Sequence, residues 1–227
     1  MARRSGMRRH VAGACLAAGL LVCSAAGRAE DLSDLRAEGQ RIATGGGPAE
    51  SQPCMACHGA DGMGDSAAGF PRLAGLNARY LDKQMEDYVS GARANAIMTP
   101  IASALDRTQR EAVAAYYAGL EPRAPAWRSR EADAAQVQHG AVLWAQGRAG
   151  QIQACVNCHG AAGARGWGAV YPDLAGQPRT YTEAQFQAFR NGERQNDQSS
   201  MMRVIAARMD EADVAAIAAF LAQLEPR

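Results

Sequence analysis

The chain has 227 residues, of which 48% are hydrophobic, 21% are charged and only 6% are aromatic. This is an ordinary globular composition, and the length allows one large domain or two small domains of roughly 100 residues each. Small domains so poor in aromatic residues have little apolar bulk of their own, so a buried cofactor would complete their cores. The formal net charge of +1 shows no basic excess that would favour nucleic acid as a partner.

Residues 1–29 have the pattern of a secretory signal peptide, with four arginines before the apolar stretch Val11–Ala26 and small-residue cleavage sites at its end. The apolar run is shorter than the ~20 residues that span a bilayer, so a membrane anchor is the weaker alternative. A lipoprotein is weaker still, because Val22 precedes Cys23 where a small residue is expected. Cleavage removes five of the 24 basic residues and no acidic one, which leaves 19 against 23. A net charge of −4 and export to the periplasm both disfavour nucleic acid.

Residues 30–121 are expected to form a first domain, with helices near residues 32–43, 77–90 and 108–120 and no strand of length. A Gly-rich loop after the first helix contains Cys54-Met55-Ala56-Cys57-His58. Cys-x-x-Cys-His is the attachment signature of c-type haem. Thiols at this spacing can reach both vinyl groups of one haem, and the adjacent histidine can ligate the iron. The sequence therefore predicts a covalent haem c on Cys54 and Cys57, with His58 as an axial ligand.

Residues 134–227 repeat this pattern after a proline-containing, charged linker at 122–133. A shift of 101 places Cys54 on Cys155 and His58 on His159, and the second motif is Cys155-Val156-Asn157-Cys158-His159. Helices are expected near residues 136–146, 180–190 and 211–224. The period is too long for a solenoid and indicates a duplicated domain. We therefore predict an all-α fold of two tandem domains, each around one haem c. Trp127 in the linker is expected to cover the seam between the domains rather than to exchange electrons.

The second axial ligand decides whether each iron is closed, for electron transfer, or open, for catalysis. Without the signal peptide the histidines are His58, His139 and His159, too few for two bis-histidine sites. Among the methionines, only Met98 meets another methionine, Met202, because the shift becomes 104 after a three-residue insertion. We assign Met98 and Met202 as iron ligands. The adjacent Met201 stays a competitor, and core packing of both methionines is the other alternative. His139 is expected to be a solvated helix residue.

Four further pairs of residues match between the copies and predict supporting contacts. The carbonyl groups of Pro71 and Pro172 could accept the ring N–H of each haem histidine and fix its orientation. Gly39 and Gly140 lie inside the first helices, where glycine costs roughly 1 kcal/mol against alanine, so a close helix crossing is expected. Arg93 and Arg194 could pair with haem propionates or face solvent. Tyr80 and Tyr181 could line the haem pocket or pack in the core. Tyr116 and Phe220 are expected to pack against Gly39 and Gly140.

The pattern resembles the dihaem cytochromes c4. The resemblance covers nearly all of the chain after the signal peptide. It is carried by both haem motifs, by the runs Phe-Pro-Arg-Leu-Ala-Gly and Tyr-Pro-Asp-Leu-Ala-Gly that follow them, and by Met98-Thr99-Pro100 with Met202. It implies two all-α cytochrome c domains with histidine–methionine haems, located in the periplasm, and an electron carrier that commonly feeds a terminal oxidase. A longer polar run before Met202 departs from the family pattern.

The expected function is electron transfer without a small-molecule substrate, in a protein that is not an enzyme. Its partners would be a membrane oxidase, a quinol–cytochrome c reductase or a dehydrogenase, and a transient association with the membrane surface is compatible with this role. The alternative is an electron-accepting subunit of a periplasmic dehydrogenase, for example a flavoprotein that oxidises a sulfur compound. A dihaem enzyme ranks lower. A peroxidase usually needs extra histidines, and a thiosulfate-oxidising cytochrome with a cysteine-ligated haem needs a thiol outside the two motifs, which the chain lacks once the signal peptide is removed.

Overall fold

The computed structural model describes residues 17–48, 52–128, 133–161, 163 and 170–226, with side chains from residue 31 onward. The chain separates into a short unit, Met1–Asp34, and a large unit, Leu35–Arg227. The first sixteen residues of the predicted signal peptide lie outside the described residues, and its cleavage stays a prediction. From Ala17 the backbone is helical and continues as α1 (Ala17–Gly45) into the large unit. None of the described helices combines the length and the apolar character needed to cross a bilayer.

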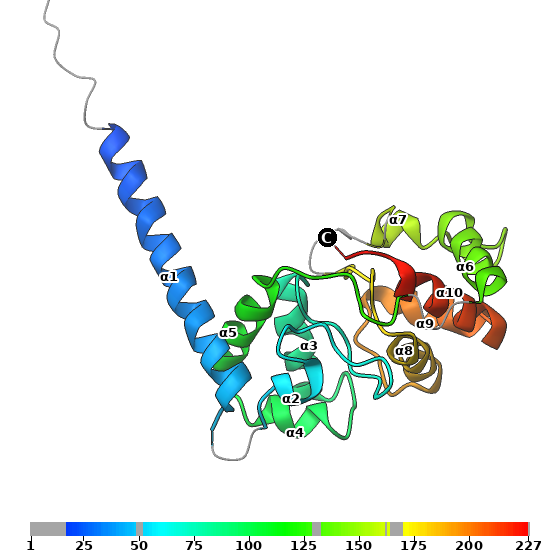
Figure 1. The fold of residues 1–227 in the computed structure, drawn as a ribbon, viewed down its shortest axis with the longest axis horizontal. Coiled ribbons are helices and arrows are strands. Elements are labelled where there is room, and N and C mark those ends of the chain that lie inside the picture. The colour runs from blue at the N-terminus through cyan, green and yellow to red at the C-terminus, as the bar shows by residue number, and fades with distance from the viewer. Residues whose placement is uncertain (1–16, 49–51, 129–132, 162, 164–169, 227) are drawn as a thin grey trace, which may run out of the picture. The chain divides into compact units, whose positions relative to one another are not determined.

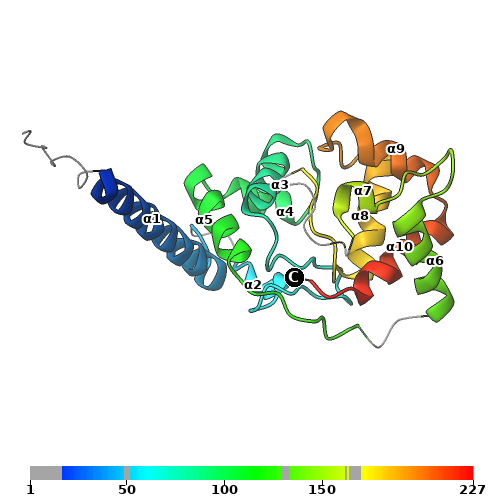
Figure 2. The same cartoon turned by 90° about the horizontal axis from the view of Figure 1, so that it is seen from above.

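The large unit holds two sets of helices that follow each other along the chain (Figures 1 and 2). After the end of α1, the first set consists of α2 (Met55–His58), α3 (Ala78–Ser90), α4 (Met98–Ser103) and α5 (Arg107–Ala118). The second set consists of α6 (Ala134–Gln146), α7 (Val156–His159), α8 (Arg179–Asn191), the 3-10 turn η1 (Gln198–Ser200), α9 (Met201–Arg208) and α10 (Glu211–Gln223). Only isolated bridges, and no strands, occur in the described residues. The all-α prediction is confirmed.

The last helix of each set begins at a capping box and buries one face. Asp106 accepts the backbone N–H of Gln109 at the start of α5, and Asp210 does the same for Asp213 at the start of α10. Such boxes satisfy backbone donors that a helix start leaves free. Apolar side chains of the two helices then pack into two separate cores, with Val113 and Tyr117 in the first and Ile217 and Leu221 in the second.

Gly39 and Gly140, which occupy matching positions of the two repeats, lie at close helix crossings, as the sequence predicted. A Cβ atom built on Gly39 would lie 2.0 Å from the carbonyl oxygen of Ala112 and 2.8 Å from the Cβ of Tyr116. A Cβ atom on Gly140 would lie 2.1 Å from the carbonyl oxygen of Ala216 and 2.7 Å from the Cβ of Phe220. The backbones of α1 and α5, and of α6 and α10, therefore touch at positions that only glycine can occupy.

Two short helices, α4 and α9, lie outside the ranges where the sequence predicted helices. α4 has six residues and α9 has eight, so each is too short for an apolar period to be recognised. Both begin at a methionine, Met98 in α4 and Met201 in α9. The structure therefore presents the candidate sulfur ligands from helix starts rather than from irregular chain.

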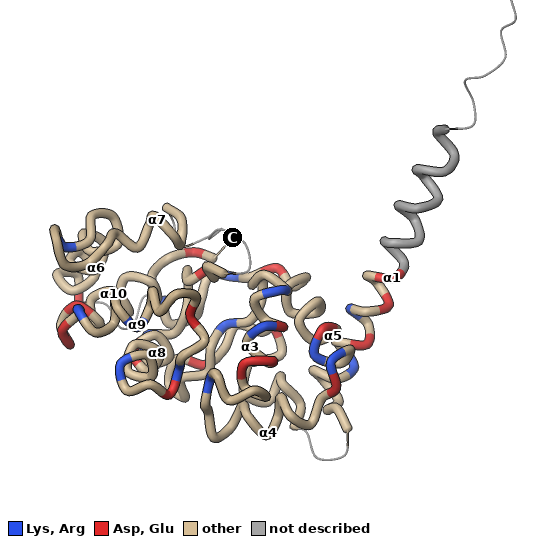
Figure 3. The backbone as a smooth tube through the Cα atoms, turned by 180° about the vertical axis from the view of Figure 1, so that it is seen from behind, with Lys and Arg blue, Asp and Glu red and all other residues tan. Residues whose placement is uncertain are grey.

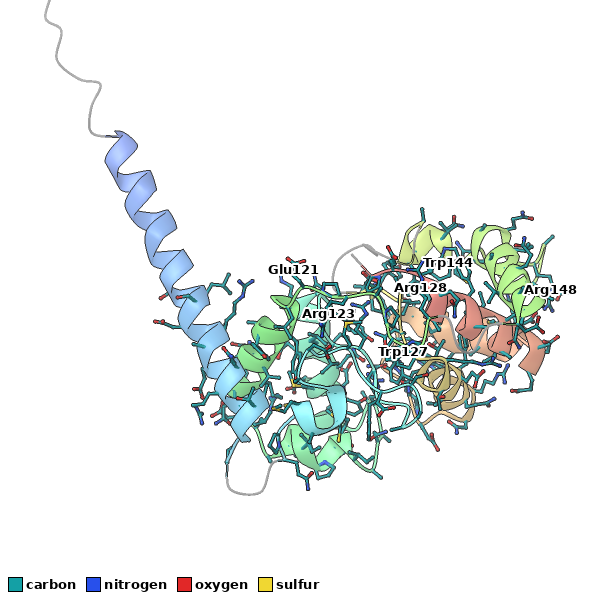
Figure 4. All side chains as sticks on the ribbon, viewed as in Figure 1. Glu121, Arg123, Trp127, Arg128, Trp144 and Arg148 are labelled. Carbon is teal, nitrogen blue, oxygen red and sulfur yellow. The ribbon has the colours of Figure 1, made fainter. Side chains whose placement is uncertain are left out.

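The segment between α5 and α6 is anchored at both of its described ends. Arg123 pairs with Asp61 of the first repeat, and Arg128 pairs with Glu225 of the second. Figure 4 labels both arginines and Trp127, which lies between them in the sequence. Trp127 is half-buried, and its indole nitrogen is buried without a hydrogen-bond partner. Acidic and basic residues are interspersed along the backbones of α3, α5 and α8 (Figure 3), so these helices carry charges of both signs.

Candidate haem-binding sites

Each Cys-x-x-Cys-His motif folds as one short helical turn. Cys54 precedes α2, and its carbonyl oxygen accepts the backbone N–H groups of Cys57 at 3.2 Å and His58 at 2.9 Å. Cys155 does the same for Cys158 at 3.2 Å and His159 at 3.0 Å. Residues three apart share one face of a helix, so each turn directs its two thiols to the same side.

The four motif cysteines have intermediate exposure, and none of them is in a disulfide. Burial raises the pKa of the Cys54 thiol, and it raises that of the Cys155 thiol to about 11. The first thiol of each pair is therefore neutral at pH 7. Two thiols on one helical turn, with a histidine directly after the second, are the donor set for thioether attachment of a porphyrin.

Both motif histidines are buried and oriented by a proline carbonyl group, as the repeat comparison predicted. The Nδ1 atom of His58 lies 2.9 Å from the carbonyl oxygen of Pro71, and that of His159 lies 2.9 Å from the carbonyl oxygen of Pro172. Burial lowers the pKa of both rings, although the carbonyl contact opposes this shift. A neutral ring that donates from Nδ1 keeps its Nε2 lone pair for a metal.

One cavity of about 990 Å³ is lined by both motifs and by four methionines, Met85 and the three proposed as ligands, Met98, Met201 and Met202. Met98 also packs against the first core and Met202 against the second. Met201 is placed differently, because its sulfur lies 3.7 Å from the hydroxyl of Tyr171, which donates to it. All three methionines proposed from the sequence thus reach the cavity. His139 is 47% exposed, lies 3.6 Å from Asp213 and is not among the lining residues.

The aromatic surroundings of the two histidines differ. The ring of His58 lies 6.2 Å from that of Phe70. His159 has two aromatic neighbours at the same centroid distance, Tyr171 edge-on and Trp144 tilted. Trp144 comes from α6, next to α7 (Figure 4), and its indole N–H donates to the carbonyl oxygen of Ala161. Trp144 was not among the site residues predicted from the sequence. The first repeat has Ala43 at the matching position, and this replacement of alanine by tryptophan could have pointed to a site residue.

Arg93 and Arg194 correct one of the two expectations made for them, because neither is exposed to solvent. They are 5% and 8% exposed and form an antiparallel bridge with each other. Arg93 donates to the hydroxyl of Tyr181 at 2.9 Å, and Arg194 donates to that of Tyr80 at 3.3 Å. The two tyrosines line the cavity and therefore connect each repeat to the arginine of the other.

The same two guanidinium groups have neutral partners. Their further side-chain contacts are hydrogen bonds to amide oxygens and stacking on aromatic rings, from Gln84, Gln185, Asn196, Tyr88 and Phe189. No ion pair is recorded for either arginine in the described part of the chain. Two buried cations that line one cavity suit an anionic group inside it.

The residues fit covalently attached haem by three independent features of the structure. The thiol pairs project from single turns, the histidines are neutral and held at Nδ1, and the cavity carries two buried cations, one from each repeat, that suit the carboxylates of haem propionates. When bound, a haem iron takes up and gives back one electron. Fold and sites together define a cytochrome c with two tandem haem domains.

The comparisons with known proteins agree with this class. The cytochrome c family model matches residues 37–121 and residues 137–225. The thiosulfate dehydrogenase electron acceptor of Stutzerimonas stutzeri (strain A1501) is 46% identical over 191 residues, covering 83% of this chain and 87% of the relative. Cytochrome c4 of Pseudomonas aeruginosa is 37% identical, covering 77% of this chain and 85% of the relative.

Two solved structures resemble the chain. Reduced recombinant cytochrome c4 from Pseudomonas stutzeri has a TM-score of 0.69 and 31% identity, covering 83% of this chain and 97% of the other. Thiosulfate dehydrogenase (TsdBA) from Marichromatium purpuratum has a TM-score of 0.73 and 38% identity over 82% of this chain. The match spans only 40% of that longer chain.

The chain belongs to the cytochrome c family, within its dihaem cytochrome c4-like group. It carries two covalently bound haem c groups, one on Cys54 and Cys57 and one on Cys155 and Cys158. It is an electron-transfer protein that works with redox partners and is not itself an enzyme.

Proposed function

We propose that both irons are closed on both sides, by His58 and Met98 in the first domain and by His159 and Met202 in the second. The observation that carries this is the cavity, which is lined by both histidines and by both methionines. Met202 is preferred over Met201 because the sulfur of Met201 already accepts a hydrogen bond from Tyr171. Closed coordination leaves electron transfer as the chemistry of the protein.

Arg93 and Arg194 are proposed to pair with the haem propionates. The two guanidinium groups are buried, line the cavity and have neutral protein partners. Burial raises the pKa of the Tyr181 hydroxyl, but the adjacent Arg93 and Arg194 outweigh burial and hold that pKa below its ordinary value. This electropositive cluster favours carboxylates at the place where residues of both repeats meet.

The partner proposed on the donor side is a thiosulfate-oxidising dehydrogenase, with the carrier delivering to a terminal oxidase in the periplasm. Two relatives named as thiosulfate dehydrogenase electron acceptors, at 46% and 43% identity, support this choice over the cytochromes c4 at 34–37%. The second candidate is a stable subunit of such a dehydrogenase. Elution as a monomer from a mixture with the enzyme at high salt supports a mobile carrier, whereas co-elution supports a subunit.

The axial ligands are tested by the weak sulfur-to-iron absorption band of the purified, oxidised holoprotein. We expect this band at the full intensity of two haems. Met98→Ala and Met202→Ala should each remove about half of it, and Met201→Ala should leave it unchanged. Loss of half the band in Met201→Ala, with Met202→Ala unaffected, would transfer the assignment to Met201.

The donor is tested by mixing the oxidised holoprotein with a thiosulfate dehydrogenase and thiosulfate and following the absorption of the reduced haems. Reduction should require both the enzyme and thiosulfate. No reduction above the rate with the enzyme alone contradicts this donor and leaves the assignment of the iron ligands standing.

A further inference from the structure

The backbone segments that lead to Met98 and Met202 differ in conformational strain. In the first domain the side chain of Asn95 accepts the N–H groups of Ile97 at 3.0 Å and Met98 at 2.8 Å. All positive φ angles described for the first domain belong to glycine. Met98 thus starts α4 from an ordinary side-chain-capped turn, which holds it without strained backbone.

The segment before Met202 is strained. It is three residues longer than its counterpart and forms the turn η1, in which Ser199 has a φ of 53° and Ser200 a φ of 58°. These are the two non-glycine residues with positive φ in the described chain. A side chain beyond glycine makes this left-handed region unfavourable, and such conformations persist only where surrounding contacts impose them.

A polar clamp imposes the strained turn. Asp197, whose side chain is 4% exposed, accepts the guanidinium of Arg203 at 2.8 Å and the backbone N–H of Arg203 at 3.0 Å. Arg203 also donates to the hydroxyl of Ser200 at 2.9 Å. The clamp therefore ties both ends of the turn to the first turn of α9, which carries Met202.

We propose that the methionine side of the second haem is a binding site for small neutral nitrogen donors, which the first haem admits much less readily. The inference rests on Met98 and Met202 as the iron ligands. The clamp ties the strained turn to the start of α9, and a bond from Met202 to the iron would hold that start in place. Release of Met202 lets the first turn of α9 shift and Ser199 and Ser200 leave the left-handed region, so an incoming ligand displaces this sulfur with help from relieved strain. Release of Met98 brings no such relief. The unequal backbones thus make two chemically identical ligand sets unequally displaceable.

The probe is imidazole, added to the oxidised holoprotein while the sulfur-to-iron band is recorded. The band should disappear in two steps, with midpoints that differ at least tenfold in imidazole concentration. The single remaining band of Met98→Ala should follow the low-concentration step, and that of Met202→Ala the high-concentration step. These variants assign each step to one haem.

Two changes to the turn test the physical cause. Replacing both Ser199 and Ser200 by glycine removes the left-handed penalty, so the second-haem midpoint should move at least threefold towards that of the first. Arg203→Gln loosens the clamp, so the turn can relax while Met202 stays bound, and this variant should move the second-haem midpoint in the same direction. Ala96→Gly in the unstrained loop of the first domain is the matched control and should leave both midpoints in place.

Coincident midpoints in the wild type overturn the proposal, and so does a gap that the double glycine variant leaves unchanged. A protein that shows no sulfur-to-iron band before imidazole is added overturns the methionine ligands themselves and the proposal with them. The two failures are therefore distinguishable in the same titration.

Discussion

Arg72 and Asp173 occupy the same position of the two repeats and form an ion pair with each other, with 3.2 Å between Nη2 and Oδ1. Equivalent positions of a duplicated domain can meet only near an axis that relates the two copies, where identical residues would oppose themselves. Two arginines or two aspartates would repel each other there. The two copies carry opposite charges at this position. The pair therefore favours contact between a first repeat and a second repeat over contact between two identical repeats.

Replacing one partner of this pair by leucine should destabilise the holoprotein strongly. Arg72 is fully buried and also donates to the carbonyl oxygens of Ala74 and Ala175. Removing one partner leaves the other charge buried, which costs about 3–5 kcal/mol, whereas replacing both by apolar residues is often close to neutral. Asp173→Leu should therefore cost more than Arg72→Leu combined with Asp173→Leu, in chemical denaturation followed as a double-mutant cycle.

The exposed pair Arg107–Glu111, with side chains 84% and 40% exposed, supplies the control for this cycle. Its removal should change the free energy of unfolding by less than about 1 kcal/mol. Strictly additive changes in unfolding free energy at Arg72 and Asp173 would show that the two side chains have no interaction energy. The opposite charges would then not favour contact between the two repeats.

The Asp173 carboxyl predicts a specific dependence of stability on pH. Burial raises its pKa above 3.8, although Arg72 opposes that shift. A group that holds its proton more tightly in the folded state contributes stability that is fully present below its unfolded pKa and is lost as the pH rises through its folded pKa. The advantage of the wild type over Asp173→Asn in unfolding free energy should therefore decline as the pH rises from about 3.8. A difference independent of pH across this range would contradict the raised pKa.

The longer helices, the haem motifs and the proline carbonyl contacts were predictable because each follows from a local pattern that occurs in both repeats. Pro71 and Pro172 follow their haem histidines by the same number of residues. The duplicated sequence therefore predicted the same carbonyl contact in both repeats. The crossing at Gly39 was predictable for the same reason, since a glycine kept inside both first helices needs a steric cause.

The contacts between the repeats were not predictable, because no local pattern states which surfaces meet. Arg93 and Arg194 matched each other in the sequence, yet their burial depends on Tyr181 and Tyr80 of the opposite repeat. The exchange of arginine for aspartate at Arg72 and Asp173 was visible inside otherwise matching runs. Its meaning required knowing that the two positions face each other.

The helix crossings predict a sharp difference between glycines of the same helix. Gly39→Ala places a methyl group 2.0 Å from the carbonyl oxygen of Ala112, so α1 and α5 must separate, at a cost of about 1–3 kcal/mol or more. A Cβ on Gly45 meets nothing within 4 Å, so Gly45→Ala should be neutral or stabilise by up to about 1 kcal/mol. Thermal unfolding of the two holoprotein variants tests this, and equal shifts would contradict a close crossing at Gly39.

If Arg93 and Arg194 pair with haem propionates as proposed, replacing either arginine should change the reduction potential of the haems. Removing a buried positive charge stabilises the oxidised iron, which carries the larger positive charge, so Arg93→Gln and Arg194→Gln should each lower at least one reduction potential. A charge on the order of 10 Å away, at an effective dielectric constant of about 20, contributes about 1–2 kcal/mol. Spectroelectrochemical titration measures the shift, with Arg107→Gln on the exposed face of α5 as the control. Unchanged potentials in folded Arg93 and Arg194 variants would show that the cluster only joins the repeats, because a guanidinium paired with a propionate cannot be removed without a change in the field at the iron.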